Sequence, residues 1–413
     1  MIRILLFLFL IALAACERPI PEDENFLRHL LERNESKFQA TLSNDSLEVQ
    51  IIYTQIIRDS LNRPSFKSFY YHVDSTHYFY PASTVKLPQV LLALEKLNEL
   101  RAMGYSIDKY SPIYHDSLYE GQLSVKMDTT ALDSIPTVAH YAKKIMVVSD
   151  NDAFNRLYEF VGQKATNEKM CAKGYNVRFL HRLERPLTPD QNRHTEAIRF
   201  VRNDTVLYQQ PMLVNSDSIR APRRVFKGKG FIRKDSIIQQ PFDFTYKNSY
   251  PLQEQQEILK AILFPEAVDA KRRFKLTADD RQFVMKYMSQ LPRETQEPSY
   301  YKDTTLYDAY CKFLLFGDDQ TPIPSNIRIF NKVGDAYGYL IDNAYIVDFE
   351  NGVEFMLSAV INTNTDGIYN DGKYEYKTIG YPFMKNLGQV VYDYERKRKR
   401  KNKPELSEFR INR

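Results

Sequence analysis

Hydrophobic residues recur along the chain with two distinct periods. Helical spacing predicts helices over residues 24–41, from Ser83 to about Leu100, and over 137–147, 151–161, 252–264, 277–290 and 380–395. Shorter runs rich in Ile, Val, Tyr and Phe predict strands at 48–58 and 66–73 near the start, and at 327–333, 337–349 and 353–362 near the end. Strands therefore stand at both ends of the chain, and helices lie between them.

This order of elements predicts one α/β domain over residues 26–395. Its antiparallel sheet is assembled from the N- and C-terminal strands and flanked by helices, and an all-helical subdomain is inserted in the middle. Residues 198–250 differ, because they contain several short strand-like runs and a hairpin signature at Asn203-Asp204. We expect this segment to be a β-rich insertion.

The first sixteen residues predict a signal peptide that is not part of the fold. A short basic start is followed by LLFLFLIALA, which is too short to span a bilayer. Leu13-Ala14-Ala15-Cys16 resembles a bacterial lipobox, in which Cys16 becomes the lipidated first residue of the mature protein. Residues 17–25 would then form a tether, and the protein would be a membrane-anchored lipoprotein of the periplasm or cell surface, on the outer membrane in preference to the inner one. A plain signal peptide with a coincidental Cys16 is the alternative.

Basic residues are concentrated near the C-terminus. The chain of 413 residues has a formal net charge of +5, and seven of its Lys and Arg residues lie between Arg396 and Lys403. Without this run the protein is mildly acidic, so nothing supports nucleic-acid binding. Residues 396–413 are therefore a basic tail, which is either solvated or in contact with anionic lipid or lipopolysaccharide phosphates.

The remaining cysteines and the histidines do not indicate a metal site. Cys171 and Cys311 are either single thiols or a disulfide pair in an oxidising compartment, and neither has metal-ligand spacing. His72 and His77, on a predicted strand, are interpreted as ordinary surface or core residues. The sequence thus predicts no metal and no cofactor.

Three short motifs follow one another along the chain. Ser83-Thr84-Val85-Lys86 opens a long predicted helix, Ser149-Asp150-Asn151 lies between two helices, and Lys332-Val333-Gly334 lies in a C-terminal strand. At a helix start, backbone N–H groups and the helix dipole favour negative charge developing on a serine, and the i+3 spacing brings a lysine onto the same face. Such a lysine acts as a base only if burial and neighbouring cations lower its pKa.

Each motif alone is weak evidence. Ser106-Ile107-Asp108-Lys109 repeats the spacing of the first motif within a polar loop, and the second motif is also a good helix cap. Together, the order and context of the three motifs resemble class A β-lactamases and penicillin-binding proteins. The helix that follows the first motif, the helix over 276–292 and the C-terminal strands are similar to that family as well. The resemblance covers roughly residues 24–195 and 252–395 and implies a β-lactamase-like fold.

The resemblance also implies catalytic roles for five residues. Ser83 would attack a carbonyl, and Lys86 would accept or relay its proton. Ser149 and Lys332 would bridge proton transfer to the leaving nitrogen, while Asn151 would position Lys86 and the substrate amide. The implied substrate is a β-lactam or a peptidoglycan-type amide.

The residues of the third motif would line the substrate site. The backbone N–H groups of Ser83 and Asp335 would form an oxyanion hole, and Val333 and Gly334 would lie beside them. Val333 stands where the family has Thr, whose hydroxyl binds a substrate carboxylate. We therefore expect substrates that lack a free carboxylate at that place.

The family's loop that activates the deacylating water is altered. Residues 182–192 match this loop at both ends, but the position of its catalytic Glu falls on Leu187 or Thr188. Glu184 matches a structural acid of the loop instead. Deacylation should therefore be slow, as in penicillin-binding proteins.

These residues favour a serine hydrolase that forms an acyl-enzyme and turns it over slowly, unless Asp190 or Glu196 replaces the missing base. Its substrate would be a β-lactam, a peptidoglycan stem peptide or another cell-envelope amide or ester. One alternative is a penicillin-binding or sensing envelope lipoprotein with little or no turnover. Another is a structural lipoprotein that binds proteins through the β-rich segment.

Overall fold

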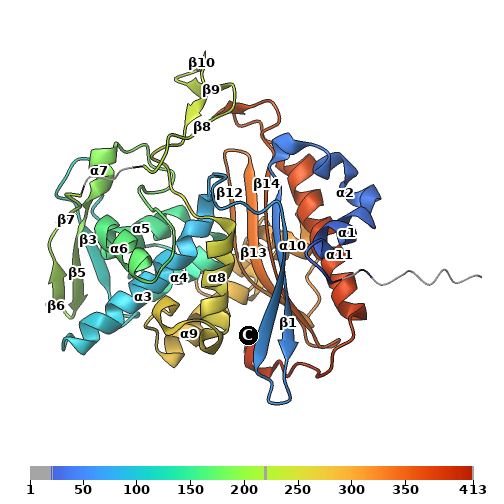
Figure 1. Ribbon diagram of the computed structural model, residues 1–413. Coiled ribbons are helices and arrows are strands. Elements are labelled where there is room, and N and C mark those ends of the chain that lie inside the picture. Colours follow the sequence, from blue (N-terminus) through green and yellow to red (C-terminus); the bar gives the residue numbers. More distant parts are fainter. Residues whose placement is uncertain (1–19, 21, 218–220, 412–413) are drawn as a thin grey trace, which may run out of the picture.

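A central antiparallel sheet joins the two ends of the chain in the computed structural model, which describes residues 20, 22–217 and 221–411 (Figure 1). The strand order is β12 (Ile327–Ala336), β13 (Tyr339–Asp348), β14 (Val353–Asn362), β1 (Gln50–Arg58) and β2 (Pro64–Tyr71). Every neighbouring pair is antiparallel. The predicted sheet of N- and C-terminal strands is therefore confirmed.

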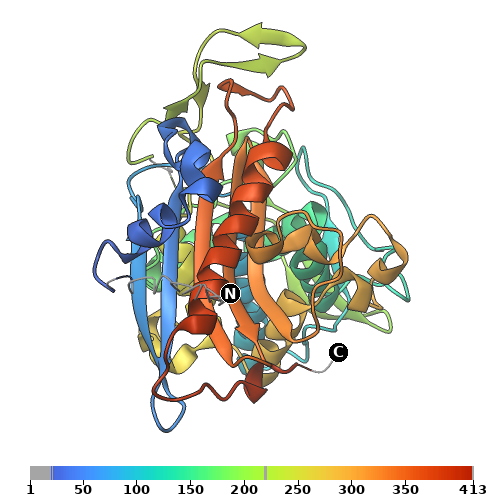
Figure 2. The ribbon, with the colours of Figure 1, turned by 90° about the vertical axis from the view of Figure 1, so that its right-hand side faces the viewer.

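Helices cover both faces of this sheet (Figures 1 and 2). One face packs against α8 (Leu252–Leu263) and α9 (Ala278–Ser289), and α3 (Lys86–Ala102), α4 (Val138–Val148) and α5 (Asn151–Val161) belong to the same apolar cluster. The other face packs against the terminal helices, namely α1 (Phe26–Glu32), α2 (Glu35–Leu42), α10 (Phe313–Phe316) and α11 (Tyr381–Lys397). The sheet is thus covered on both sides, which explains why every residue of β13 and β14 is buried and most are apolar.

Two predicted helices differ from the observed ones, one by a break and the other at its start. The helix expected over 24–41 is broken at Asn34, whose side-chain amide donates to the carbonyl of Leu30 at 2.9 Å and thereby satisfies a group that α1 leaves unpaired. The helix expected to start at Ser83 begins instead as a 3₁₀ turn over Ala82–Val85, and α3 starts at Lys86. Both differences follow from local backbone geometry at a helix end.

The strand-rich segment starts slightly earlier than expected and is not self-contained. It comprises β4 (His194–Thr195), β5 (Ala197–Arg202), β6 (Thr205–Gln210), β7 (Leu213–Val214), β8 (Phe226–Lys227), β9 (Gly230–Arg233), β10 (Ser236–Ile238) and β11 (Phe242–Asp243). Asn203 and Asp204 form the β5–β6 turn with φ angles of 48° and 60°, as a tight hairpin requires. β5 also pairs with β3 (Ile113–Asp116), and β9 with β15 (Ile368–Tyr369). Distant parts of the chain therefore hold this segment in place.

Two short helices, α6 (Gln163–Ala172) and α7 (Pro189–Arg193), complete the helical side of the molecule. The cysteines Cys171 and Cys311 are both free thiols, the first exposed and the second buried. Within the described residues, no helix is long and apolar enough to cross a membrane. Cys16 and the signal peptide predicted over residues 1–16 lie outside the described residues.

Candidate active site

Ser83 lies in a tight turn at the start of α3. Ala82 before it has a φ of 47°, in the left-handed region that a residue with a Cβ rarely adopts. The hydroxyl of Thr84 donates to the carbonyl of Pro81 at 2.6 Å and so closes the turn. This backbone leaves Ser83 partly exposed at the edge of a cavity, whereas Lys86, one turn further on, is fully buried.

Ser149, of the second motif, contacts the lysines of the first and third motifs. The ammonium group of Lys86 donates to the carbonyl of Ser149 and, at 3.1 Å, to its hydroxyl oxygen. From the sheet, Lys332 on β12 donates to the same hydroxyl oxygen at 2.8 Å. Ser149 can take this position because it ends α4 in a left-handed conformation, with φ of 60°. Residues 86, 149 and 332, far apart in the sequence, therefore meet as the motifs predicted.

The electrostatics favour a neutral lysine at this place. Burial, together with the positive charge of Lys332, holds the pKa of Lys86 well below its ordinary value. Burial also lowers the pKa of Lys332, although nearby acidic groups, among them Asp335, oppose the shift. A lysine with a lowered pKa has an unprotonated fraction near neutral pH and can accept a proton.

The third motif lines the site with its backbone. Gly334 lies against the turn that holds Ser83, and Asp335 follows at the edge of the cavity. The side chain of Val333 points away and is buried in the apolar cluster under α10 and α11. The substrate contact expected of residue 333 is thus limited to its backbone.

The cavity beside Ser83 has a volume of about 720 Å³. Besides Ser83, Asn151, Asp335 and Glu184, it is lined by a group of aromatic and charged residues that sequence reasoning missed, namely Tyr80, His181, Phe242, Lys247, Tyr337 and Tyr374. Tyr337 packs edge-on against Tyr80 at 4.9 Å between ring centroids, and Phe242 comes from the strand-rich segment. These residues carry no local signal in the sequence, because tertiary packing alone brings them together.

The loop over residues 182–192 keeps a structural framework but no acid at the expected place. Arg182 is buried and pairs with both carboxylate oxygens of Glu159. Neither Leu187 nor Thr188 lines the Ser83 cavity, whereas Glu184, with a φ of 52°, does. The interpretation of residue 184 as a structural acid is therefore wrong for this chain, since Glu184 is exposed and faces the cavity.

The two acids expected to replace the missing base are engaged elsewhere. Glu196 is fully buried and contacts Arg156 at 3.0 Å and His115 at 3.1 Å. Asp190 is exposed and accepts a hydrogen bond from the hydroxyl of Tyr119 at 2.6 Å. Of these acids only Glu184 lines the cavity of Ser83.

The repeated motif at Ser106 is confirmed as a coincidence of spacing. Ser106 is exposed, and the ammonium group of Lys109 is paired with Asp279 and with Asp280 of α9. A lysine held by two carboxylates keeps its proton, and the pKa of Lys109 is indeed raised despite the opposing effect of burial. It cannot act as a base for Ser106.

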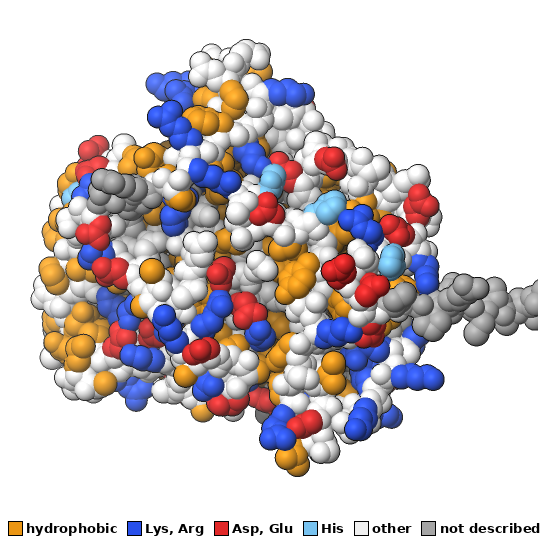
Figure 3. Space-filling view, viewed as in Figure 1, with side chains coloured by type: hydrophobic (Ala, Val, Ile, Leu, Met, Phe, Trp, Pro, Cys, Tyr) orange, Lys and Arg blue, Asp and Glu red, His pale blue; other side chains and the backbone are white. Residues whose placement is uncertain are grey.

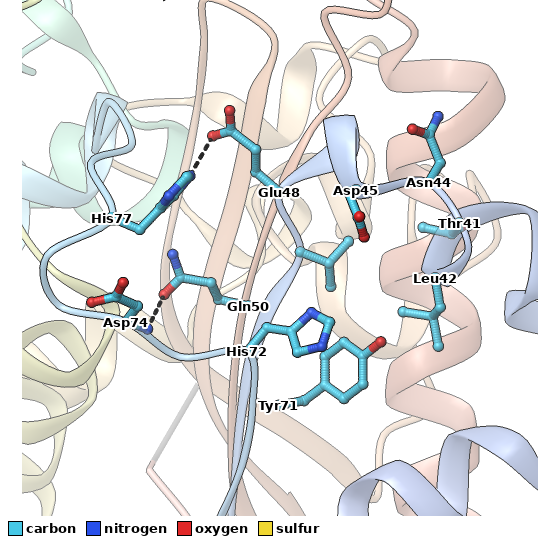
Figure 4. Close-up of a pocket in the computed structure, with 11 residues that line it drawn as sticks. Thr41, Leu42, Asn44, Asp45, Glu48, Gln50, Tyr71, His72, Asp74 and His77 are labelled. Atoms are coloured by element: carbon cyan, nitrogen blue, oxygen red, sulfur yellow. Dashed lines mark hydrogen bonds and ion pairs between the residues drawn. The ribbon is translucent and has the colours of Figure 1, made fainter.

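A second cavity, of about 240 Å³, lies between the end of α2 and the start of β1. Figure 4 shows the residues that line it. His77 contacts Glu48 there at 3.1 Å, and His72 stacks on Tyr71 with ring centroids 4.1 Å apart. None of the residues that line it belongs to the three motifs. Across the described residues, no group of three or more His, Cys, Asp or Glu side chains could hold a metal ion.

Comparison with known proteins agrees with the motifs. Residues 34–218, which include Ser83 and Ser149, match the family model described as "Beta-lactamase enzyme family". No curated protein matches the chain. A β-lactamase from Xanthomonas campestris pv. campestris is 13% identical, with 90% of this chain and 97% of that one covered and a TM-score of 0.48. PBP-A is 15% identical, with 90% and 97% covered and a TM-score of 0.48. A class A β-lactamase from Clostridium kluyveri is 14% identical, with 88% and 98% covered and a TM-score of 0.44. Over residues 34–218 the chain is therefore β-lactamase-like, and the resemblance that the three motifs indicate is confirmed.

Proposed function

We propose that the protein is a cell-envelope serine hydrolase that forms an acyl-enzyme at Ser83 and releases the acyl group slowly. The observation that carries this proposal is the convergence of Lys86 and Lys332 on the hydroxyl of Ser149, beside a cavity that Ser83 lines. The substrate class is a β-lactam or a peptidoglycan-type amide. The alternative, a penicillin-binding or sensing protein with little turnover, uses the same first step.

Acylation uses the lowered pKa of Lys86. Its neutral amine takes the proton of the Ser83 hydroxyl, directly or through a water, while the serine oxygen attacks the carbonyl carbon. The backbone N–H groups of Ser83 and Asp335 stabilise the negative carbonyl oxygen, an interaction worth about 3–4 kcal/mol per donor in serine hydrolases.

Departure of the leaving group uses the Ser149 hydroxyl. Ser149 gives its proton to the departing nitrogen as the C–N bond breaks and regains one from Lys86 or Lys332, which both lie within hydrogen-bonding distance. The products at this stage are the ester on Ser83 and a neutral amine. Asn151, at the same cavity, donates its side-chain amide to the acyl part of the substrate.

Release of the acyl group requires a water molecule to lose a proton. The loop over residues 182–192 offers no acid at Leu187 or Thr188, so the ester on Ser83 should persist. A general base typically contributes about 10²–10⁴-fold to such a step. We therefore expect acylation to outpace deacylation.

Incubation with a fluorescent penicillin, followed by intact mass spectrometry over time, tests this function. We expect one equivalent of label on wild-type protein, no label on Ser83→Ala, and full labelling of Ser106→Ala, the matched serine with the same motif spacing. A burst of one equivalent of nitrocefin hydrolysis should precede slow turnover. Label that persists on Ser83→Ala would exclude Ser83 as the nucleophile, and rapid turnover without a burst would exclude slow deacylation.

We further propose that the protein is anchored to the membrane through a lipid on Cys16, on the outer membrane in preference to the inner one. The lipobox-like sequence Leu13-Ala14-Ala15-Cys16 supports this anchor. Metabolic labelling with palmitate should depend on Cys16. A Cys16→Ala variant that is still labelled and membrane-bound would contradict it.

A further inference from the structure

The basic run over residues 396–403, which begins in the last turn of α11, does not form a free tail. Its residues alternate between the protein and the solvent from Lys397 onward. Arg398 donates to a carboxylate oxygen of Glu395 at 2.8 Å, and Arg400 donates to the backbone carbonyl of Glu395 at 2.8 Å. Asn402 donates to the carbonyl of Arg58 on β1 at 2.9 Å. Further on, Phe409 is buried in the core, so the segment is fixed at both ends.

This alternation turns the intervening side chains outward as one basic face. Lys397, Lys399, Lys401 and Lys403 are all exposed, and Arg396 is exposed beside them. Within the described part of the chain, none of these four lysines belongs to an ion pair. Figure 3 shows Lys and Arg side chains gathered at the lower right of the molecule. The acidic neighbours Asp393 and Glu405 are exposed at the ends of the run and leave its centre positive.

The basic face lies beside the place where the chain enters the domain. Glu22 lines the same groove as Lys399 and Lys401. Its carboxylate accepts hydrogen bonds from Tyr394 of α11 at 2.8 Å and from Lys67 of β2 at 2.9 Å, which fix it there. Cys16 stands six positions before Glu22, and an extended chain reaches about 20 Å over six positions.

We propose that the lysines of the basic face dock on the anionic phospholipid headgroups of the membrane that holds the anchor. The proposal rests on the lipid anchor at Cys16. A single lipid attachment and a cluster of basic residues reinforce each other, because each lysine near the surface adds electrostatic attraction to anionic headgroups. Docking would fix the orientation of the domain, with the β9–β10 hairpin of the strand-rich segment, at the top of the molecule in Figure 1, pointing away from the bilayer.

Site-resolved acetylation of lysines tests this orientation. The full-length lipidated protein is reconstituted into vesicles of phosphatidylcholine alone or of phosphatidylcholine with about a third phosphatidylglycerol, in low salt. We expect acetylation of Lys399, Lys401 and Lys403 to be several-fold slower in the anionic vesicles and to recover in about 0.5 M NaCl, where charges are screened beyond about 4 Å. Lys229, an exposed lysine of the strand-rich segment, should react equally in both.

Variants distinguish the effect of the lysine charges of the basic face from the effect of the lipid anchor. When Lys399, Lys401 and Lys403 are changed together to Gln, the remaining Lys397 should be acetylated equally in both kinds of vesicle. The single control Lys229→Gln should leave protection of the basic face intact. Equal acetylation of the basic face in neutral and anionic vesicles, with the lipid on Cys16 confirmed by mass, would overturn the proposal. A protein without that lipid would contradict the anchor instead, and would leave penicillin labelling of Ser83 unaffected.

Discussion

Gly334 lies so close to Ser83 that a Cβ built on Gly334 would stand 2.9 Å from the backbone nitrogen of Ser83. The same Cβ would stand 2.9 Å from the carbonyl oxygen of Pro81. Both neighbours are backbone atoms of the turn that carries the serine, so neither can rotate away as a flexible side chain would. The sheet and the turn that carries Ser83 therefore meet at a point where only a glycine fits.

Gly334→Ala should separate these two backbones and displace Ser83 relative to Lys332. Misplacement of a nucleophile by about 1 Å can cost about 10²-fold in rate, and we expect a loss of that size in the acylation rate with a fluorescent penicillin. The unfolding temperature should change far less, because the contact lies at one end of β12. Wild-type acylation by Gly334→Ala would show that the close approach has no functional role.

The pH dependence of acylation should report the pKa of Lys86. The rate should rise with pH as Lys86 loses its proton, at a pH well below the ordinary pKa of a lysine, since burial and Lys332 lower the pKa of Lys86. Removing the charge in Lys332→Met should raise the pKa of Lys86. The rising limb of the pH–rate profile should then move to higher pH. Lys332→Arg keeps the charge and should keep the limb in place, whatever its effect on the maximal rate. A limb that stays fixed in Lys332→Met would contradict the coupling.

Elements with strong local signals were predictable from the sequence. The helix expected over 277–290 is one example, since Thr277 and Asp280 form a reciprocal capping box at the start of α9 that depends only on their spacing of three residues. The turn at Asn203-Asp204 likewise depends on two residue types that tolerate a positive φ. The 3₁₀ turn at Ser83 could not be predicted in this way, because Ala82 has no intrinsic preference for the left-handed conformation that it adopts there.

The candidate site, too, was predictable only where short motifs determine it. The meeting of Lys86, Ser149 and Lys332 followed from three short motifs in a known order. The places of Glu184 and Glu196 did not, since burial of Glu196 depends on Arg156 and His115, which come from other parts of the chain. A short stretch of sequence cannot show which of two acids in one loop region has such partners.

Glu196 should therefore be important for stability. Its carboxylate is fully buried between Arg156 and His115, whose interactions hold its pKa below the ordinary value although burial opposes them. Removing one partner of a buried ion pair typically costs about 3–5 kcal/mol, and we expect Glu196→Gln to lower the free energy of unfolding by an amount of this order. The stabilisation that the Glu196 carboxylate provides is fully present above the ordinary pKa of a glutamate. It should be lost as the pH falls through the lowered pKa of Glu196.

Denaturant-induced unfolding measures this effect. Asp190→Asn is the matched control, because Asp190 is exposed and its substitution should change the free energy of unfolding by less than about 0.5 kcal/mol. Equal stability of Glu196→Gln and Asp190→Asn would show that the buried pair contributes nothing.

Residual deacylation should depend on Glu184 and not on Asp190. Glu184 is the one acid of the loop over residues 182–192 that lines the cavity of Ser83, and its exposed carboxylate can orient and deprotonate a water there. Among the described residues no hydrogen bond or ion pair fixes its carboxylate, unlike that of Glu159, which pairs with Arg182. Glu184 should therefore be an inefficient base. We expect Glu184→Gln to slow release of the acyl group about tenfold, well below the 10²–10⁴-fold of a well-placed base.

Acylation and deacylation are measured separately by the mass of the penicillin adduct. Its formation is followed with ligand present, and its decay after excess ligand is removed. The rate of adduct formation should be nearly unchanged in Glu184→Gln, since Lys86 serves that step, while the adduct should decay more slowly than in wild type. Asp190→Asn should decay at the wild-type rate, because the hydroxyl of Tyr119 binds its carboxylate outside the Ser83 cavity. If the adduct decays equally fast in Glu184→Gln and wild type, Glu184 is not the base, and release must depend on water activated by another group at the cavity.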